Sequence, residues 1–303
     1  MNIAAALIPV FALIALGAAL HRTRFIEETS WRAVERVTYY VLFPCFLFNA
    51  IATADFTGRP IGRLAVLLLG AIMVMAALTY ALQSAFRFDG PAFSSVFQGA
   101  VRFNSYVALG AIAALLGREG VALSAIAVAV MVPFLNTLCV SVLMRHADGG
   151  EMGLTVFAKQ FVQNPLIMSS LAGIAVHLLG IPLPNFVATA VDMAGKAALP
   201  LGLMAVGASL DLADARARPA PVIVASGLRL LVMPSLVAFG AMLVGVAGSA
   251  KTAALICAAV PGASSSYILA RQLGGDARLM ANITTAQTLA AMVTMPLILW
   301  VFG

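Results

Sequence analysis

Charged side chains are scarce in this chain of 303 residues. Asp, Glu, Lys and Arg together make up 10% of it, whereas a soluble domain carries about 25%. Hydrophobic residues make up 62%, and apolar runs of about 20 residues, the length that crosses a bilayer core of roughly 30 Å, recur along the chain. The sequence therefore lacks the polar side chains that a water-facing surface needs. These proportions exclude a soluble domain and predict an integral membrane protein.

Cysteine and the motifs of enzymes are also scarce. Cys45, Cys139 and Cys257 lie in apolar runs without CxxC spacing, which favours buried core residues over a metal or redox site. The sequence has no Walker A, HExxH or GxSxG motif, so neither ATP-driven transport nor enzymatic activity is indicated, and we expect no cofactor. The net charge of +6 comes without a polar basic domain, which argues against a nucleic-acid partner.

What the sequence does contain is an ordered series of apolar segments. Their periodicity and the polar residues between them predict an all-α membrane protein with ten transmembrane helices. The first apolar run has no basic residue before it, so we interpret it as a retained helix and not as a signal peptide. The predicted helices cover residues 2–20, 35–52, 62–84, 93–116, 121–143, 163–180, 187–209, 220–246, 252–272 and 281–302.

The ten segments divide into two related sets of five. Residues 1–144 and 163–303 are predicted five-helix repeats, joined by a short cytoplasmic connector at 145–162. Because each repeat has an odd number of spans, the second must enter the membrane from the opposite side, which defines an inverted repeat. Inverted repeats are typical of secondary transporters, whose substrate site lies near the membrane midplane. The residues that recur at offsets of 156 to 163 are Pro9 and Pro165, Pro44 and Pro200, Pro60 and Pro219, Tyr106 and Tyr267, and Pro133 and Pro296.

Basic residues indicate how the chain is oriented. Eleven of the 18 Lys and Arg residues follow odd-numbered segments, and four follow even-numbered ones. Because cytoplasmic loops carry the excess of Lys and Arg, the odd loops are predicted to be cytoplasmic, with both termini outside the cytoplasm.

Two stretches at equivalent positions in the repeats are prone to interrupt their helices. RFNSYVALG at 102–110 contains asparagine and serine, whose side chains prefer caps and turns. In PGASSSYILA at 261–270 a proline removes a backbone donor, and three serines can bond the freed groups. The candidate residues are Arg102, Asn104, Ser105, Tyr106, Ser264, Ser265, Ser266 and Tyr267 for binding, with Phe103, Pro261 and Gly262 at the breaks.

The two breaks have a consequence for the charge that a ligand carries. Half-helices that start near Ser105 and Ser265 would direct unpaired N–H groups and positive dipole ends at the midplane, which favours an anion. The alternative, that the serines only allow helices to pack closely, stays open.

Arg102 is the basic residue for which the sequence supplies no partner. It lies about nine residues, or ~14 Å, into its span, close to the bilayer centre. Asp192, the one acidic residue expected inside the membrane, is predicted to pair with Lys196 one helical turn away. Arg102 is therefore expected to contact either a substrate carboxylate or the carbonyls of an interrupted helix.

Other polar residues inside the apolar segments are weaker candidates. Asn136 is a second candidate for binding, and Gln287 a less favoured one. Arg229 also lies deep but has no turn-forming neighbours, so a packing role is predicted for it. His177 stands alone near the end of its segment and is interpreted as structural.

The two break-prone stretches, together with PLGLMAVGASL at 200–210 and the segment 261–297, resemble the bacterial branch of the auxin efflux carrier family over essentially the whole chain. The resemblance implies two inverted five-helix repeats whose broken helices cross, as in bile-acid symporters and sodium/proton antiporters. It also implies a scaffold bundle and a transport bundle that move like an elevator. Dimers occur in the family, so a homodimer is a further expectation.

The resemblance also bears on single residues. In the plant PIN carriers an asparagine beside the first crossover holds the substrate carboxylate, and Asn104 matches it. Asn136 falls where a residue of the fifth span lines their site. Those carriers have prolines at both crossovers, whereas Phe103 and Ser266 stand at these places here.

Together these features predict a secondary transporter of small organic anions in a bacterial inner membrane, similar to the malonate transporters. Arg102 and Asn104 would bind the carboxylate of a mono- or dicarboxylate, aided by the helix starts at Ser105 and at 264–266. The alternatives are an anion channel and an exporter of auxin-like aromatic carboxylates. Coupling to sodium, coupling to protons and uniport all stay open.

Overall fold

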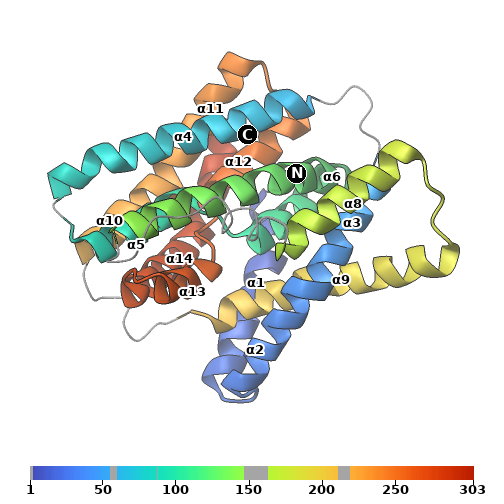
Figure 1. Ribbon diagram of the computed structural model, residues 1–303, viewed down its shortest axis with the longest axis horizontal. Helices are drawn as coiled ribbons and strands as arrows, with labels where there is room; N and C mark the ends of the chain where they lie inside the picture. Colours follow the sequence, from blue (N-terminus) through green and yellow to red (C-terminus); the bar gives the residue numbers. More distant parts are fainter. Residues whose placement is uncertain (1–2, 55–59, 87, 147–162, 211–218) are drawn as a thin grey trace.

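The structure is a computed structural model of the chain, and it describes residues 3–54, 60–86, 88–146, 163–210 and 219–303. Every regular element in these ranges is a helix (Figure 1). The predicted connector falls mainly on residues 147–162, which lie outside the described residues. The same holds for Arg59, Arg87, Lys159, Arg216 and Arg218, which enter the count of basic residues in loops.

The helices form two bundles, each of which combines segments from both halves of the chain (Figure 1). In the first bundle α1 packs on α9, and α3 packs on α8 and α9. It consists of α1 (Ile3–Arg22), α2 (Glu28–Val37), the π-helical turn η1 (Thr38–Leu42), α3 (Phe43–Ala52), α8 (Pro165–Leu179) and α9 (Asn185–Ala208).

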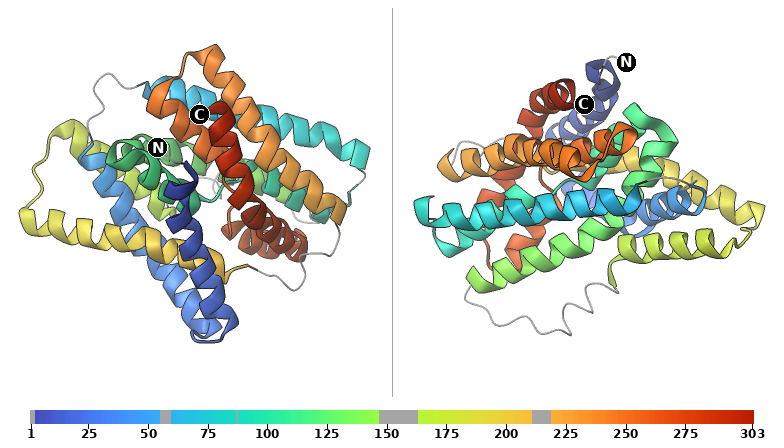
Figure 2. Two further views of the ribbon diagram at one scale, coloured as in Figure 1. Left: turned by 180° about the vertical axis from the view of Figure 1, so that it is seen from behind. Right: turned by 90° about the horizontal axis from the view of Figure 1, so that it is seen from above.

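The second bundle holds the remaining helices, and α6 (Ser105–His146) contacts both bundles. Besides α6, the second bundle consists of α4 (Ile61–Phe86), α5 (Gly90–Val101), α10 (Pro219–Gly227), the π-helical turn η2 (Leu228–Val232), α11 (Met233–Val244), α12 (Gly248–Ala259), α13 (Ser265–Gln272) and α14 (Ala277–Phe302). The N-terminal end of α1 and the C-terminal end of α14 lie on the same side of the molecule (Figure 2).

All ten predicted segments contain helix in the part of the chain that the structure describes, and those at 93–116 and 252–272 are interrupted within their length. By length and composition alone, six stretches of the described residues are long and apolar enough to cross a membrane, and two shorter apolar helices accompany them. The six are Ala5–Arg22, Ile61–Phe86, Gly90–Ala125, Asn185–Ala208, Pro219–Val244 and Ala277–Phe302, and the shorter two are Val130–His146 and Pro165–Leu179. The chain therefore has the helical content of a multi-pass membrane protein.

The segment predicted at 35–52 differs from the structure at its start, because the helix already begins at Glu28. α2 carries charged residues on its exposed side and buries Trp31 on the other. An amphipathic helix of this kind is less apolar than the segment that follows it. Apolar periodicity alone therefore places the start of the helix too late. The helix then continues through η1 into α3 without a break.

Gly117 separates the fourth predicted segment from the fifth within α6. Its backbone has φ 60° and ψ −155°, a region that only glycine adopts without strain. The helix therefore stops and restarts at Gly117, between the predicted ends at 116 and 121. The part of α6 before Gly117 follows the first break, and the part after it forms a further helix.

The first bundle is held together by a close approach of two backbones. A Cβ atom on Gly207 of α9 would collide with the main-chain carbonyl of Ile14 in α1. A Cβ atom on Gly17 of α1 would collide with the carbonyl of Met204 in the same way. Small residues that let helices approach this closely are common at helix contacts inside membranes.

Candidate functional site

Two helices are interrupted at the predicted places, and the interruptions touch. α5 ends at Val101 and α6 begins at Ser105, whereas α12 ends at Ala259 and α13 begins at Ser265. The main-chain N–H of Asn104 donates a hydrogen bond to the carbonyl of Pro261, with an N···O distance of 2.9 Å. The predicted helix starts at Ser105 and Ser265 are therefore confirmed.

The first residue of each break has the same extended backbone. Arg102 has φ −75° and ψ 149°, and Val260 has φ −74° and ψ 155°. Each main-chain N–H still closes the last turn of its helix, onto Gln98 and Ile256 respectively. The two helices thus end in the same way, although the second break is longer by two residues, 260–264 against 102–104.

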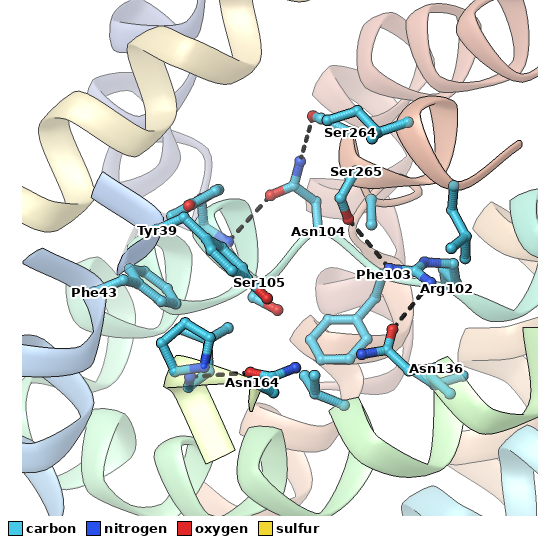
Figure 3. Close-up of a pocket in the computed structure, with 18 of the residues that line it drawn as sticks. Tyr39, Phe43, Arg102, Phe103, Asn104, Ser105, Asn136, Asn164, Ser264 and Ser265 are labelled. Carbon is cyan, nitrogen blue, oxygen red and sulfur yellow. Dashed lines mark hydrogen bonds between the residues drawn. The ribbon is translucent and has the colours of Figure 1, made fainter. Parts of the chain in front are cut away.

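The side chain of Asn104 caps the start of α6. Its Oδ1 atom accepts hydrogen bonds from the main-chain N–H groups of Tyr106 (3.1 Å) and Val107 (3.2 Å). Its Nδ2 atom donates to Oγ of Ser264 at 3.3 Å (Figure 3). Two of the N–H groups that were expected to face an anion are thus satisfied by Asn104. The start of α13, by contrast, has no side-chain cap.

Arg102 is fixed by two neutral oxygen atoms (Figure 3). Its Nη1 donates to Oδ1 of Asn136 and its Nη2 donates to Oγ of Ser265, both at 3.1 Å. Asn136 lies on α6 and Ser265 begins α13, so the half-buried guanidinium links two helices. Among the described residues no carboxylate lies within ion-pair distance of it. These bonds involve two of its five N–H groups.

A cavity of about 500 Å³ opens beside Arg102 and lies between the two bundles (Figure 3). This volume is in the range of small-molecule sites. Ser266, which is fully buried, and Tyr267, which is 38% exposed, are not among the residues that line it. Pro261 and Gly262 also lie outside its lining. The predicted residues that do line it are Arg102, Phe103, Asn104, Ser105, Tyr106, Asn136, Ser264 and Ser265.

The first bundle supplies cavity residues that sequence reasoning missed. Glu35 and Tyr39 line the cavity from α2 and η1. Phe43 meets Tyr106 edge to face across the boundary between the bundles, with ring centroids 4.6 Å apart. Asn164 lines the cavity too, and its Oδ1 caps α8 by accepting from the N–H of Leu166 at 3.0 Å. The Asn-Pro start of α8 was the signal that could have found it.

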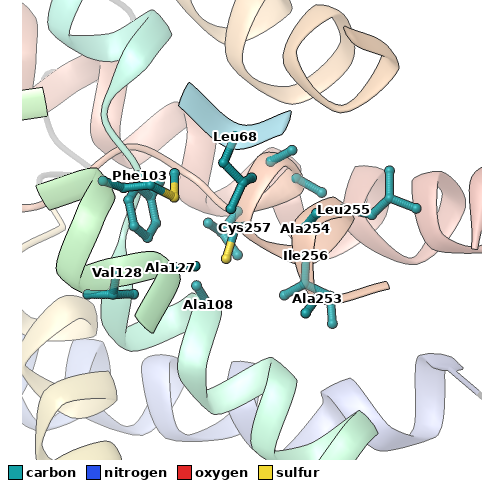
Figure 4. Close-up of a cluster of buried hydrophobic side chains, with 14 of the residues drawn as sticks. Leu68, Phe103, Ala108, Ala127, Val128, Ala253, Ala254, Leu255, Ile256 and Cys257 are labelled. Atoms are coloured by element: carbon teal, nitrogen blue, oxygen red, sulfur yellow. The ribbon is translucent and has the colours of Figure 1, made fainter. Parts of the chain in front are cut away.

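Two neutral contacts hold the breaks in place. Gln287 of α14 is fully buried, and its Oε1 accepts from the N–H of Gly262 at 2.8 Å. Its Nε2 donates to the carbonyl of Gly99 in α5 at 2.9 Å. Phe103 is 4% exposed and packs among buried apolar side chains that include Cys257 (Figure 4). Gln287 thus links both interrupted helices, and Phe103 anchors the first break in the core.

Arg229 holds the second break, and not only by packing as predicted. It lies in η2, is 1% exposed, and its Nε donates to the carbonyl of Val260 at 2.9 Å. Its Nη2 donates to the carbonyl of Cys257. Contact with the carbonyls of an interrupted helix was an alternative for Arg102, and in the structure Arg229 makes it.

The ion pair predicted between Lys196 and Asp192 lies outside the cavity. Nζ of Lys196 lies 2.6 Å from Oδ2 of Asp192, which confirms the predicted pair. Asn49 donates to Oδ1 of the same carboxylate at 3.1 Å. Within the described ranges no group of three His, Cys, Asp or Glu side chains is arranged to hold a metal ion. Among the described residues that line the cavity, Arg102 is the one basic residue and Glu35 the one acidic residue.

Known membrane transport proteins resemble the chain over nearly its whole length. The sequence model of the membrane transport protein family matches residues 2–299. An uncharacterised transporter of Methanothermobacter thermautotrophicus is 24% identical over 301 residues, which cover 95% of this chain and 94% of that protein. The match extends from the first predicted helix to the last and supports the resemblance drawn from the sequence. The chain therefore belongs to the membrane transport protein family, that of the auxin efflux carriers.

Proposed function

We propose that the protein is a secondary transporter of small organic anions that carry a carboxylate, such as malonate and related mono- or dicarboxylates. The observation that carries the proposal is the position of Arg102, a guanidinium that lines a cavity of about 500 Å³ where two helices begin. Guanidinium pairs with a carboxylate through two parallel N–H···O bonds. Helix starts favour negative charge in their vicinity.

The binding arrangement follows from the lining of the cavity. Arg102 binds the carboxylate, and Ser105, Ser264 and Ser265 supply hydroxyl groups beside it. Nδ2 of Asn104 turns from Ser264 to the substrate when the cavity is filled. The start of α13, which has no side-chain cap, faces the anion more directly than the capped start of α6.

The proposal extends to the topology of the whole chain. Ten spans form two inverted repeats, residues 1–144 and 163–303, joined by a cytoplasmic connector at 145–162. Two observations support this: each bundle combines segments of both halves, and the ends of α1 and α14 lie on one side (Figures 1 and 2). In this topology the protein spans a bacterial inner membrane, and both termini lie outside the cytoplasm.

The cavity between the bundles suggests how the substrate crosses. The first bundle serves as the scaffold, and the second carries the site past it in an elevator movement. A homodimer formed through the first bundle would keep the scaffold still. An anion channel is the alternative in which the two bundles stay in place and the cavity opens to both sides.

Uptake of radiolabelled carboxylates into proteoliposomes tests the proposal. Malonate, other short mono- and dicarboxylates and an aromatic carboxylate are compared at one concentration. We expect saturable uptake of a short carboxylate that Arg102→Gln strongly lowers while the melting temperature in detergent stays close to that of the wild type. Uptake of no carboxylate, or undiminished uptake by Arg102→Gln, contradicts the proposal.

Two further results distinguish the alternatives. Single-channel currents in planar bilayers, far above the turnover of a carrier, would identify a channel. Preferred uptake of the aromatic carboxylate would identify a carrier of auxin-like substrates.

A further inference from the structure

Two helices end inside the protein, and both ends need partners for their last carbonyl groups. α5 ends at Val101 and α12 ends at Ala259, each beside a break. The last four carbonyls of a helix have no partner within it, and they carry the negative end of the helix dipole. In transporters with broken helices, such carbonyl ends are places where coupling cations bind.

The two ends are satisfied by groups of different charge. At α5 the neutral amide of Gln287 donates to the carbonyl of Gly99 at 2.9 Å. At α12 the guanidinium of Arg229 donates to the carbonyls of Val260, at 2.9 Å, and Cys257. Only the end of α12 therefore receives a full positive charge from a described side chain.

Arg229 is placed for this contact by an unusual backbone. It is the second residue of η2, a five-residue π-helical turn between α10 and α11. π-helical turns are rare and frequently mark functional positions, because the extra residue redirects the side chains around it. The side chain is 1% exposed, and none of the described carboxylates forms an ion pair with it. The carbonyl groups of α12 are thus its counter-charge.

This contact connects to the proposed binding site through two peptide units. Val260, which accepts from Arg229, precedes Pro261. The carbonyl of Pro261 accepts the N–H of Asn104, the residue that caps α6 beside the cavity. The charge on Arg229 therefore acts on the backbone that shapes the site, although Arg229 is not part of the cavity lining.

We propose that Arg229 takes the place of a coupling cation at the carbonyl end of α12, so that anion transport needs no metal cation bound there. The inference rests on the proposed transport function. It concerns whether anion transport at this site is coupled to the binding of a metal cation. Arg229 is in this sense a positioning residue, since it holds the second break and neutralises its dipole without touching the substrate.

The first test is the cation dependence of the wild-type protein. Uptake of a transported carboxylate is measured in proteoliposomes with Na⁺, K⁺ or choline as the sole cation, at equal ionic strength and clamped membrane potential. We expect rates that agree within about twofold in the three salts. A fall of about tenfold or more in choline would overturn the proposal.

The second test removes the charge. Arg229→Gln is expected to lose uptake in choline by about tenfold or more and to regain it with Na⁺ or with millimolar methylguanidinium. Arg229→Lys keeps a cation at this place and should retain uptake in choline. Arg118→Gln, which removes an exposed arginine of α6, is the matched control. Equal uptake by folded Arg229→Gln and the wild type in choline contradicts the proposal.

A stability measurement makes the test independent of transport. The melting temperature of the purified wild type should be the same in sodium and choline chloride, whereas that of Arg229→Gln should rise when Na⁺ or methylguanidinium is added. If no carboxylate is taken up at all, the proposed function fails, and this measurement still decides on Arg229. If Arg229→Gln does not fold, the proposal is tested by the uptake of the wild type in Na⁺, K⁺ and choline and by the uptake of Arg229→Lys in choline. A wild type that Na⁺ stabilises over choline would overturn the inference.

Discussion

Gln287 and Gly262 are joined by a hydrogen bond of 2.8 Å from the main-chain N–H of Gly262 to Oε1 of Gln287. The contact leaves no room for a side chain, because a Cβ atom on residue 262 would lie 2.7 Å from Oε1. The glycine that the sequence presents as a loose point in a helix therefore lies in close contact with the end of one side chain. It lets the backbone of the second break reach the amide of α14.

Gly262→Ala should destabilise the protein by roughly 1–3 kcal/mol, the usual cost of an added methyl group in a packed core. Combined with Gln287→Ala, the loss should be smaller than the sum of the single losses, because both changes disturb one contact. Unfolding of the four proteins in detergent measures this. Strict additivity would show that the two residues do not interact.

Asn104→Asp separates capping from binding. Aspartate caps a helix about as well as asparagine, so it should still accept the N–H groups of Tyr106 and Val107. It loses the donor to Ser264 and brings a negative charge to the cavity. We expect near wild-type stability and little anion uptake, whereas Asn104→Ala should lose about 1 kcal/mol of stability as well. Full uptake by Asn104→Asp would show that this side chain caps α6 and does not bind the substrate.

Arg102→Lys should raise the KM for a carboxylate, because an ammonium group does not reproduce the paired geometry of guanidinium. Loss of a hydrogen bond to a charged group costs roughly 1.5–3 kcal/mol, or about 10- to 150-fold in KM. Initial rates over a substrate series provide the measurement. Arg118→Gln is again the control, and a KM unchanged in Arg102→Lys would contradict a direct contact with substrate.

Glu35→Gln should strengthen the binding of an anion. The Glu35 side chain is half-buried and lines the same cavity as Arg102, so its carboxylate repels an anionic substrate. Removal of this charge should lower KM by about two- to tenfold at low ionic strength, and by less in high salt. Glu28→Gln, on the exposed side of the same helix, should leave KM unchanged. A higher KM in Glu35→Gln would mean that the substrate carries a positive group as well.

Gly207→Ala tests the packing of α1 against α9 and not the binding cavity. The added methyl group would collide with the carbonyl of Ile14, so α1 and α9 would have to separate and the melting temperature should fall. Gly70→Ala is the matched control, since nothing lies within 4 Å of a Cβ atom there. Alanine is the better helix former by about 1 kcal/mol, so this variant should be as stable as the wild type or more stable. Equal melting temperatures for Gly207→Ala and Gly70→Ala would argue against the close contact.

The places where helices break could be predicted from the sequence because their causes are local. Asparagine, serine and proline compete with or remove backbone hydrogen bonds wherever they occur, so the starts at Ser105 and Ser265 needed no knowledge of the fold. Gly117 likewise lies between two predicted segments, where a turn was required.

Partners from distant parts of the chain were beyond such reasoning. The carbonyls that Arg229 holds belong to residues 257 and 260, and only the packing of η2 on α12 brings them together. Glu35 escaped notice as a cavity residue because it stands where the apolar pattern begins, and its exposure depends on which elements cover it. Asn104 lines the cavity as expected of a binding residue, and its Oδ1 atom also caps its own helix, a contact that composition does not determine.

The edge-to-face contact of Phe43 and Tyr106 sets a scale for the movement between the bundles. On the proposed elevator mechanism the two rings must part each time the cavity changes sides. An aromatic pair of this kind contributes roughly 0.5–1.5 kcal/mol, which is less than a single hydrogen bond to a charged group contributes. Binding of one carboxylate to Arg102 could therefore supply enough free energy to release the rings. On this mechanism the conformation with the rings in contact is only weakly stabilised by the aromatic pair.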